Sequence, residues 1–276
     1  MAFSLLNNIS SLVAQDQLAI TGAQLQKTLF RLASGSRINS GADDAAGLAI
    51  ADNLRANITA LTQSVRNAND GIGSLQVGDG AFAQVTNLLN RAVTLATQAG
   101  TGTVSSTQRT ALDAEFTQIK VEIDQIGLNT TFNGASVFSA TTTSIFLSDS
   151  SASSTIAVTV GILSQSSTGA SATNLSANSL TSQANAQTAL TNINAAIASV
   201  ASSRGTLGAS INRLQAASAV AQNQVENIAA SENAIRSADI GQEVANMSKF
   251  QILNQTGIAA LAQANSSNAA VLALLR

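Results

Sequence analysis

The chain offers very few side chains that could perform chemistry. Its 276 residues include no His and no Cys, so the commonest general base, the commonest nitrogen ligand for metals and the thiolate nucleophile are all absent. Charged residues make up only 10% of the sequence, and the Lys and Arg residues are scattered singly. Catalysis would therefore depend on isolated carboxylates or lysines. We expect no enzymatic activity, no metal and no cofactor.

Composition also argues against two classes of partner. The formal net charge is −2 and there is no basic run, whereas nucleic-acid binding needs a basic stripe that neutralises phosphates. No apolar segment approaches the roughly 20 residues of a membrane span, so we expect no membrane insertion. The N-terminal MAFSLLNNISSLVAQDQ lacks the basic region and cleavage site of a secretory signal peptide. This indicates either a cytoplasmic protein or export by a machine that recognises another signal.

The dominant pattern is a row of apolar residues spaced by four and three positions. One row extends from Leu54 to Val93 and a second from Leu190 to Ile235. Their average period of 3.5 residues is typical of helices that pack against a partner along their whole length. No Pro interrupts these segments. The pattern predicts a mainly α fold, in which long antiparallel coiled-coil helices form a rod.

Capping residues predict where the first helices begin and end. The first helix is expected over residues 4–34, with Gly35 as the left-handed residue that ends it. Ser40 with Asp43 has the spacing of a capping box, which predicts that the second helix begins there and continues to about Gly100.

The middle of the chain changes from a helical to an alternating pattern. Ser105 begins a third helix that Gly127 is expected to end. The Asn133-Gly134 turn signal and the alternation of apolar residues with Ser and Thr over 145–160 predict a small β-hairpin region with one buried face. Beyond Ser164 the sequence leaves open whether the segment is ordered or a solvated loop.

A phase break separates the last part of the chain. The helix that begins near Thr181 keeps its apolar phase to Ile235, and the next apolar position, Ile240, follows a step of five. We predict a joint near residues 237–239, where Asp239 can cap a new helix. Three domains are therefore predicted: a terminal helical domain (1–44 with 236–276), a coiled-coil rod domain (45–138 with 181–235), and a β-hairpin and short Ser/Thr-rich variable segment (139–180).

Both terminal helices are nearly uncharged and replace a charged face with Ala, Ser, Asn and Gln. Burying such faces costs little free energy, because they carry few charges that would lose their hydration, and they lack the charges that keep helices from associating. We expect the two helices to pair with each other and their remaining faces to pack against copies of the same chain. The predicted polymerisation seam consists of Leu6, Ile9, Val13, Ile20, Ile258, Leu261, Leu272 and Leu275. Polar positions within the C-terminal row, Gln251, Asn254, Asn265 and Asn268, could fix its register.

Several segments resemble one family. Residues 31–55, RLASGSRINSGADDAAGLAIADNLR, are similar to the N-terminal signature of bacterial flagellins. RGTLGASINRL at 204–214, ENIAASENAIRSADIGQEVANMSK at 226–249 and the ending AQANSSNAAVLALLR resemble the C-terminal signature, and QIGLNTTFNGASVF at 125–138 resembles the turn before the flagellin hairpin. The signature residues singled out are Arg31, Arg37, Asn39, Asp43 and Asp44.

The resemblance implies a secreted, extracellular subunit that self-assembles into the flagellar filament for swimming motility. It implies that the termini form the inner tube and the coiled middle forms the tube wall. It also implies type III export through the filament channel, with an export chaperone and cap or junction proteins as partners. Only about 40 residues separate the hairpin region from the C-terminal helix, so the large outer domains of longer flagellins are expected to be absent.

The resemblance further implies a contact with host Toll-like receptor 5. Arg91, Leu95 and Glu115 have the spacing of the residues that contact this receptor in many flagellins, whereas Val93 and Thr94 depart from the usual Arg-Glu pair. The alternative is that Arg91 and Glu115 are surface charges on two antiparallel helices that serve filament packing.

Other functions compete with that of a filament subunit. A flagellar hook–filament junction protein shares the terminal helices and is the principal alternative. A signalling coiled coil would have surfaces rich in Glu, Lys and Arg and a membrane span. A metallopeptidase insert, which some flagellins carry, needs a His-Glu-x-x-His zinc site, and the chain has no His. O-glycosylation of Ser or Thr within 139–182 is left open.

Overall fold

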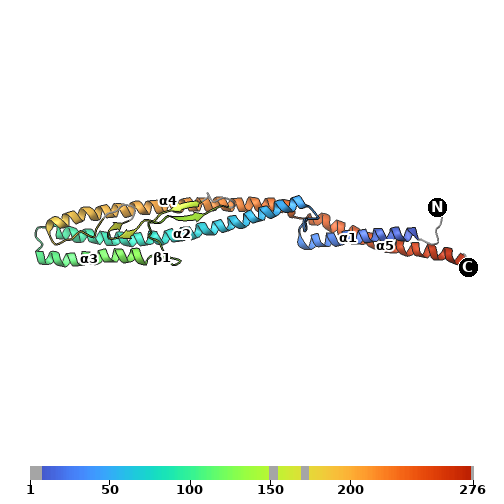
Figure 1. Cartoon of the computed structure of the whole chain (residues 1–276), viewed down its shortest axis with the longest axis horizontal. Coiled ribbons are helices and arrows are strands. Elements are labelled where there is room, and N and C mark those ends of the chain that lie inside the picture. Colours follow the sequence, from blue (N-terminus) through green and yellow to red (C-terminus); the bar gives the residue numbers. More distant parts are fainter. Residues whose placement is uncertain (1–7, 149–154, 169–173, 275–276) are drawn as a thin grey trace. The chain divides into compact units, whose positions relative to one another are not determined.

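The computed structural model describes residues 8–148, 155–168 and 174–274. These residues form five helices, with short strands between the third and fourth (Figure 1). The helices are α1 (Ile9–Ser34), α2 (Ala45–Ala99), α3 (Ser106–Asn129), α4 (Gln183–Arg236) and α5 (Ile240–Leu274). The prediction of a mainly α fold with long antiparallel helices and a small β-hairpin region is confirmed. Two compact units are present: residues 1–56 with 227–276, and residues 57–226.

The start of α2 differs from the prediction. Ser40 does not cap this helix; the helix begins at Ala45, and Asp44 is its cap, because the Asp44 carboxylate accepts a hydrogen bond from the Gly47 amide at 2.9 Å. The Asp43 carboxylate instead turns back and accepts hydrogen bonds from the Ser40 amide and hydroxyl, each at 3.2 Å. Residues 40–43 therefore form a turn, and the predicted helical start lies four residues too early.

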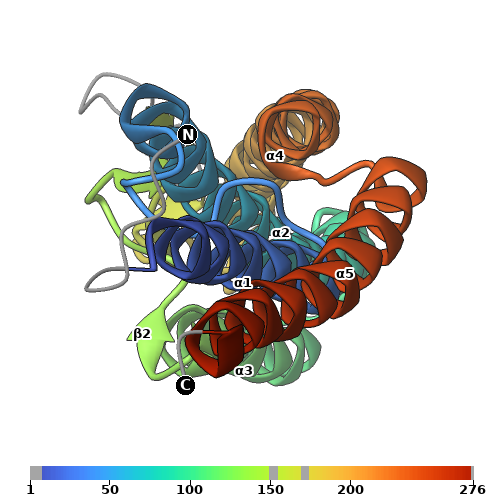
Figure 2. The same ribbon diagram turned by 90° about the vertical axis from the view of Figure 1, so that its right-hand side faces the viewer.

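The second unit is built on α2, which lies between α3 and α4 (Figures 1 and 2). The predicted apolar row of α2 is buried at every seventh residue, and the α4 row faces it. The buried side chains are Leu61, Ala68, Leu75, Phe82 and Leu89 of α2 and Ile193, Val200, Leu207 and Leu214 of α4. The guanidinium of Arg204 binds both carboxylate oxygens of Asp79, at 2.7 and 3.1 Å. This hydrogen bonding lowers the pKa of Asp79.

Glycines of α2 accommodate the hairpins that cover it. The four glycines between residues 71 and 80 lie inside the helix, as the continuous apolar phase predicted. A Cβ at Gly71 would overlap the Ile145 side chain, and one at Gly78 would lie 3.1 Å from Val137. These two positions, seven residues apart, thus give the strands room to approach the helix.

Helix α3 starts as predicted but does not end as predicted. The Ser105–Gln108 capping box is present in both directions. Gly127 does not stop the helix, which continues to Asn129. A Cβ at Gly127 would overlap the main-chain carbonyl of Leu163, so this glycine serves close packing rather than termination.

Three antiparallel strand pairs follow α3. Strands β1 (Thr131–Phe132) and β2 (Ala135–Ser136) are joined by the predicted turn, in which Asn133 and Gly134 have φ of 50° and 78°. Strands β3 (Thr143–Phe146) and β4 (Thr155–Val158) form the predicted hairpin, with Ile145 opposite Ile156 and Thr143 opposite Val158. The side chains of Ile145, Ile156 and Val158 are buried, which confirms the predicted single buried face.

The described part of the segment beyond Ser164 is ordered by α3. Strands β5 (Leu163–Ser164) and β6 (Ser167–Thr168) pair, and the side chains of Leu163, Leu175 and Leu180 are buried. We call the following contacts the α3 clamp. Asp124 accepts from the Gln165 amide at 2.7 Å and from its Nε2 at 2.6 Å, Asp113 accepts from the Leu180 amide at 2.6 Å, and Lys120 donates to the Asn178 carbonyl at 2.9 Å. Of the two possibilities for this segment, the ordered one holds for its described residues, which exclude 169–173.

Candidate assembly interface

The first unit is an antiparallel pair of α1 and α5, which lie side by side in Figures 1 and 2. Three contacts along the pair establish its register. The Asn8 side chain donates to the Ala264 carbonyl at 3.1 Å, Leu18 packs on Gly257, and Arg31 binds Glu243 at 3.2 Å. The expected pairing of the two terminal helices is therefore present.

The fully buried positions of the seam between α1 and α5 carry small or polar side chains, and larger apolar side chains such as Leu18, Leu25 and Phe250 are half-buried beside them. The buried residues of α1 are Ser11, Thr21 and Thr28, and the buried residue of α5 is Glu243. Buried and half-buried positions of α5 continue through Met247, Phe250, Asn254, Gly257, Leu261 and Ala264. Only part of the predicted C-terminal row thus faces α1. Ile240, Val244, Gln251 and Ile258 of that row are exposed.

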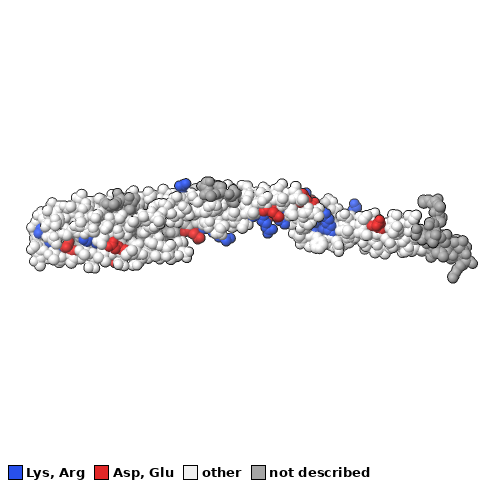
Figure 3. Space-filling view, in the orientation of Figure 1, with Lys and Arg blue, Asp and Glu red and all other residues white. Residues whose placement is uncertain are grey.

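Large apolar side chains lie on the outside of this pair, which we call the outer apolar face. It consists of Ile9, Leu12, Val13, Ile20, Leu29 and Phe30 of α1 and Ile240, Val244, Ile252, Leu253 and Ile258 of α5. These are eleven of the eighteen exposed large hydrophobic residues among those described. A solvated helix shows the opposite arrangement, with its polar side outward. Figure 3 shows that charges are sparse over this pair of helices. Exposed large apolar side chains in this number are typical of a surface that is covered by a partner.

The predicted polymerisation seam falls largely on this face. Ile9, Val13, Ile20 and Ile258 are 54–65% exposed, and Leu261 is half-buried toward α1. Leu6 and Leu275 lie outside the described residues, and for Leu272 only the helical backbone is described. The prediction missed Leu12, Leu29 and Phe30, which are also exposed on α1.

The N-terminal signature residues organise the loop between α1 and α2. Arg37 donates from its amide to the Arg236 carbonyl at 2.6 Å and from its side chain to the Ile235 carbonyl at 3.0 Å. Asn39 donates from its side chain to the Ser36 carbonyl at 3.1 Å. The loop is thereby tied to the end of α4. The predicted joint lies here, and Asp239 caps α5 by accepting from the Gln242 amide at 3.1 Å.

An ionic cluster joins α1, this loop and α5. Lys27 binds Asp43 at 2.6 Å, and Arg31 lies 3.8 Å from Asp43 and 3.2 Å from Glu243. The hydrogen bond from Lys27 is the main cause that lowers the pKa of Asp43 to about 2. Arg31 and Asp43 belong to the predicted N-terminal signature, whereas Lys27 and Glu243 do not, because nothing local in the sequence indicates that Glu243 meets α1.

The three residues of the proposed receptor contact behave differently. Arg91 of α2 binds Glu115 of α3 at 2.7 Å, and both side chains are exposed. The hydrogen bond to Glu115 raises the pKa of Arg91. The side chain of Leu95 is only 1% exposed and belongs to the core, so it has no surface to offer a receptor. The structure brings Arg91 and Glu115 together at the surface and buries the side chain of Leu95.

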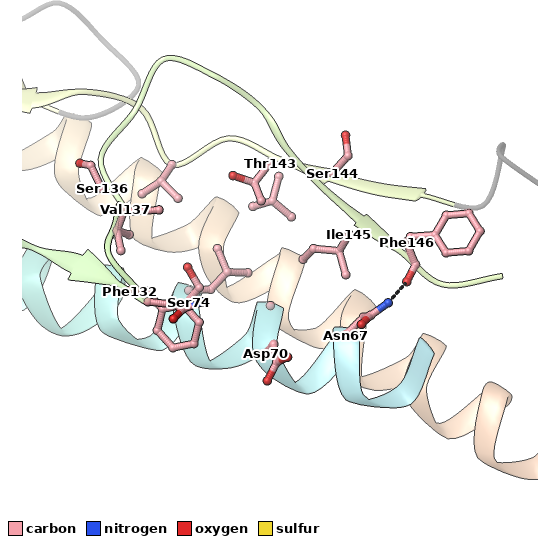
Figure 4. A pocket seen from close by; sticks show the side chains of 16 residues that line it. Asn67, Asp70, Ser74, Phe132, Ser136, Val137, Thr143, Ser144, Ile145 and Phe146 are labelled. Carbon is pink, nitrogen blue, oxygen red and sulfur yellow. Dashed lines mark hydrogen bonds between the residues drawn. The ribbon is translucent and has the colours of Figure 1, made fainter. Parts of the chain in front are cut away.

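A groove of about 730 Å³ lies between α2 and the first two hairpins (Figure 4). Its floor includes Gly71 and Leu75, and Asn67 at one end donates to the Phe146 carbonyl at 3.1 Å. Asp70 is the one ionisable side chain among its lining residues, so the groove holds no acid–base pair. Among the described residues, no three His, Cys, Asp or Glu side chains cluster as metal ligands would, and no helix is long and apolar enough to cross a membrane.

Comparison with known proteins covers nearly the whole chain. The model of the bacterial flagellin N-terminal helical region matches residues 5–143, and that of the C-terminal helical region matches residues 190–275. A flagellin from Halalkalibacterium halodurans is 36% identical over 98% of both chains. Flagellin FlaB2 from Treponema pallidum is 32% identical over 98% of this chain and 99% of that one. The crystal structure of Bacillus cereus flagellin, 32% identical, aligns with a TM-score of 0.48 over 60% of this chain and 94% of that one. Family models at both ends and relatives of matching length together show that the chain belongs to the bacterial flagellin family.

Proposed function

We propose that this chain polymerises through the outer apolar face and forms a filament that serves swimming motility. A structural, non-enzymatic role follows from its family. The observation that carries the proposal is the α1–α5 pair, in which the fully buried residues of α1 are Ser11, Thr21 and Thr28, whereas eleven large Ile, Leu, Val and Phe side chains of the two helices are exposed. Covering such a surface with copies of the same chain removes apolar area from water and stabilises the polymer.

Related assignments follow from the same proposal. We propose extracellular localisation after type III export, with a chaperone that covers the outer apolar face before export and cap or junction proteins that contact it in the filament. Arg91 and Glu115 are proposed to contact Toll-like receptor 5; a cell reporter assay with Arg91→Ala tests this, and an unchanged response would remove Arg91 from the site.

Point substitutions on the outer apolar face test the polymerisation proposal. The triple variant Ile9→Asn, Val13→Asn, Ile20→Asn keeps the Ser11 and Thr21 seam positions and makes the outer side of α1 polar. We expect it to remain soluble in sedimentation under conditions in which the unchanged chain pellets as filaments. Leu128→Asn is the matched control, since Leu128 is 70% exposed but lies on α3 in the other unit.

Two results would contradict the proposal. Filaments formed by the triple variant as readily as by the control would exclude the α1 face as the assembling surface. An unchanged chain that polymerises only when other flagellar components are added would favour the hook–filament junction alternative. Electron microscopy of the pelleted material distinguishes filaments from amorphous aggregate.

A further inference from the structure

We propose that Arg31 and Glu243 are positioning residues that fix the register of α1 against α5 and thereby decide which apolar residues share the outer apolar face. This inference deepens the proposed function and depends on it for its biological meaning. The two residues lie 212 positions apart in sequence and meet at 3.2 Å across the seam. Lys27 and Asp43 flank them and connect the pair to the loop after α1.

Main-chain hydrogen bonds hold the joint, from the Ala238 amide to the Gly35 carbonyl and from the Arg37 amide to the Arg236 carbonyl, but the side chains of the helical seam beyond it specify register weakly. The seam positions of α1 alternate between the small residues Ser11, Thr21 and Thr28 and leucines seven residues apart (Leu18, Leu25 and Leu32), and those of α5 are Met247, Phe250, Asn254, Gly257, Leu261 and Ala264. Both helices present these positions at spacings of three and four, so a slide by one heptad, about 10.5 Å along the axis, brings similar side chains together again. Shape alone therefore discriminates poorly between the two arrangements.

The ion pair between Arg31 and Glu243 strongly favours the observed register over a register shifted by one heptad. A slide of one heptad would carry Arg31 from Glu243 to the position of Phe250, and Glu243 would lie beyond the end of α1. Glu243 has only 9% of its side chain exposed, and Arg31 has 24%. A charge buried without its partner is strongly destabilising, and fixing register is the best supported use of buried polar groups.

The geometry of the Arg31–Glu243 pair indicates that it selects one register of α1 against α5 rather than adding to the free energy of unfolding. Arg31 Nε and Glu243 Oε2 are both buried and have no hydrogen-bond partner among the described residues. A pair arranged for maximal stability would satisfy these atoms, for example by bidentate binding. The pair thus contributes little net stability compared with apolar side chains of similar size, while it penalises every other register.

Disulfide crosslinking of the full chain measures the register directly, since the chain has no Cys of its own. Leu18→Cys with Gly257→Cys reports the observed register, because Leu18 Cδ1 lies 3.2 Å from a Cβ built on Gly257. Leu18→Cys with Ala264→Cys reports the register shifted by one heptad. Each Cys pair is placed in the otherwise unchanged chain, in the double variant Arg31→Met, Glu243→Met, and in the control Glu232→Gln. The control removes an ion pair with Arg236 that lies within one helix.

We expect the ratio of shifted to observed crosslink to rise by about tenfold or more in the double Met variant and to stay unchanged in the control. Thermal stability of the double Met variant, followed by circular dichroism, should match that of the unchanged chain, so that loss of register is separated from unfolding. An unchanged crosslink ratio would overturn the inference. So would an increase of the same size in the control. Failure of the unchanged chain to polymerise would refute the proposed function alone, because the crosslink ratio is measured in the soluble chain as well.

Discussion

The contact between Phe82 and Phe138 offers a quantitative test of the core of the second unit. Phe82 is fully buried in the middle of α2, and its ring meets that of Phe138 edge-on, with centroids 5.0 Å apart and planes at 77°. Replacing a buried Phe by Ala removes its transfer free energy and leaves a cavity, which together cost about 3–5 kcal/mol. We therefore predict that Phe82→Ala lowers the free energy of unfolding of this unit by about 4 kcal/mol.

The aromatic geometry contributes a separable part of this loss. Edge-to-face pairs contribute about 0.5–1.5 kcal/mol beyond their buried area. A double-mutant cycle with Phe82→Leu and Phe138→Leu isolates this coupling, because Leu retains most of the apolar contact. We predict a coupling free energy within that range.

Urea unfolding followed by far-ultraviolet circular dichroism is the suitable assay, since the chain has no Trp or Tyr whose fluorescence could be followed. Phe30→Ala is the matched control, because Phe30 is 68% exposed on α1. We expect the control to change the free energy of unfolding of the second unit by less than about 0.5 kcal/mol. A loss below about 1 kcal/mol for Phe82→Ala would refute the inference that this ring is central to the core.

Two further predictions concern a close backbone approach and a pH dependence. Gly127→Ala should destabilise the second unit by about 1–3 kcal/mol, despite the better helix propensity of Ala, because its Cβ would overlap the Leu163 carbonyl. Gly80→Ala should instead stabilise the second unit by up to about 1 kcal/mol, because a Cβ at Gly80 has no neighbour within 4 Å. Thermal melts of both variants check this contrast. The pKa of Asp43 is lowered from 3.8 to about 2 by the hydrogen bond from Lys27, so its contribution to stability is present above pH 3.8 and is lost as the pH falls through about 2. Asp43→Asn should therefore flatten the pH dependence of the melting temperature between those values, and an unchanged slope would show that the ion pair does not form in solution.

Much of the fold could be predicted because the 3.5-residue spacing of apolar residues identifies both the helix and the side of it that is buried. The rows through Leu75 and Phe82 and through Ile193 and Leu207 are buried as the spacing indicated. Local capping chemistry also predicted correctly that α1 ends at Gly35, where φ is 67°. These features depend on residues within one or two turns of each other.

The errors arose where distant residues decide the local structure. Ser40 had the spacing of a cap, and the Asp43 carboxylate does accept from the Ser40 amide, but its other oxygen binds Lys27 of α1, and Asp44 caps α2 instead. Gly127 had the position of a helix terminator, but the Leu163 carbonyl that requires a glycine there comes from a later strand.

Only part of the outer apolar face could be predicted from the sequence. The nearly charge-free ends led us to expect that other copies of the chain cover both terminal helices. Ile9, Val13 and Ile20 of the predicted seam are exposed in the α1–α5 pair of the single chain. The sequence did not predict which side of α5 faces α1. Asn and Gly occupy some of the positions that face α1, and a pattern based on apolar residues does not include them. The contact between Arg31 and Glu243, far apart in sequence, is what reveals it.

The α3 clamp has a consequence for how freely the middle of the chain can vary. Asp113 and Lys120 hold main-chain atoms of Leu180 and Asn178, and one of the two contacts of Asp124 is with the main chain of Gln165. Contacts of this kind do not depend on which side chains the held segment carries. Substitutions can therefore accumulate at its exposed positions without redirecting its path, provided that the buried leucines remain. The segment is therefore a suitable place to insert a foreign peptide, because residues of the neighbouring helix α3 hold its main chain in position.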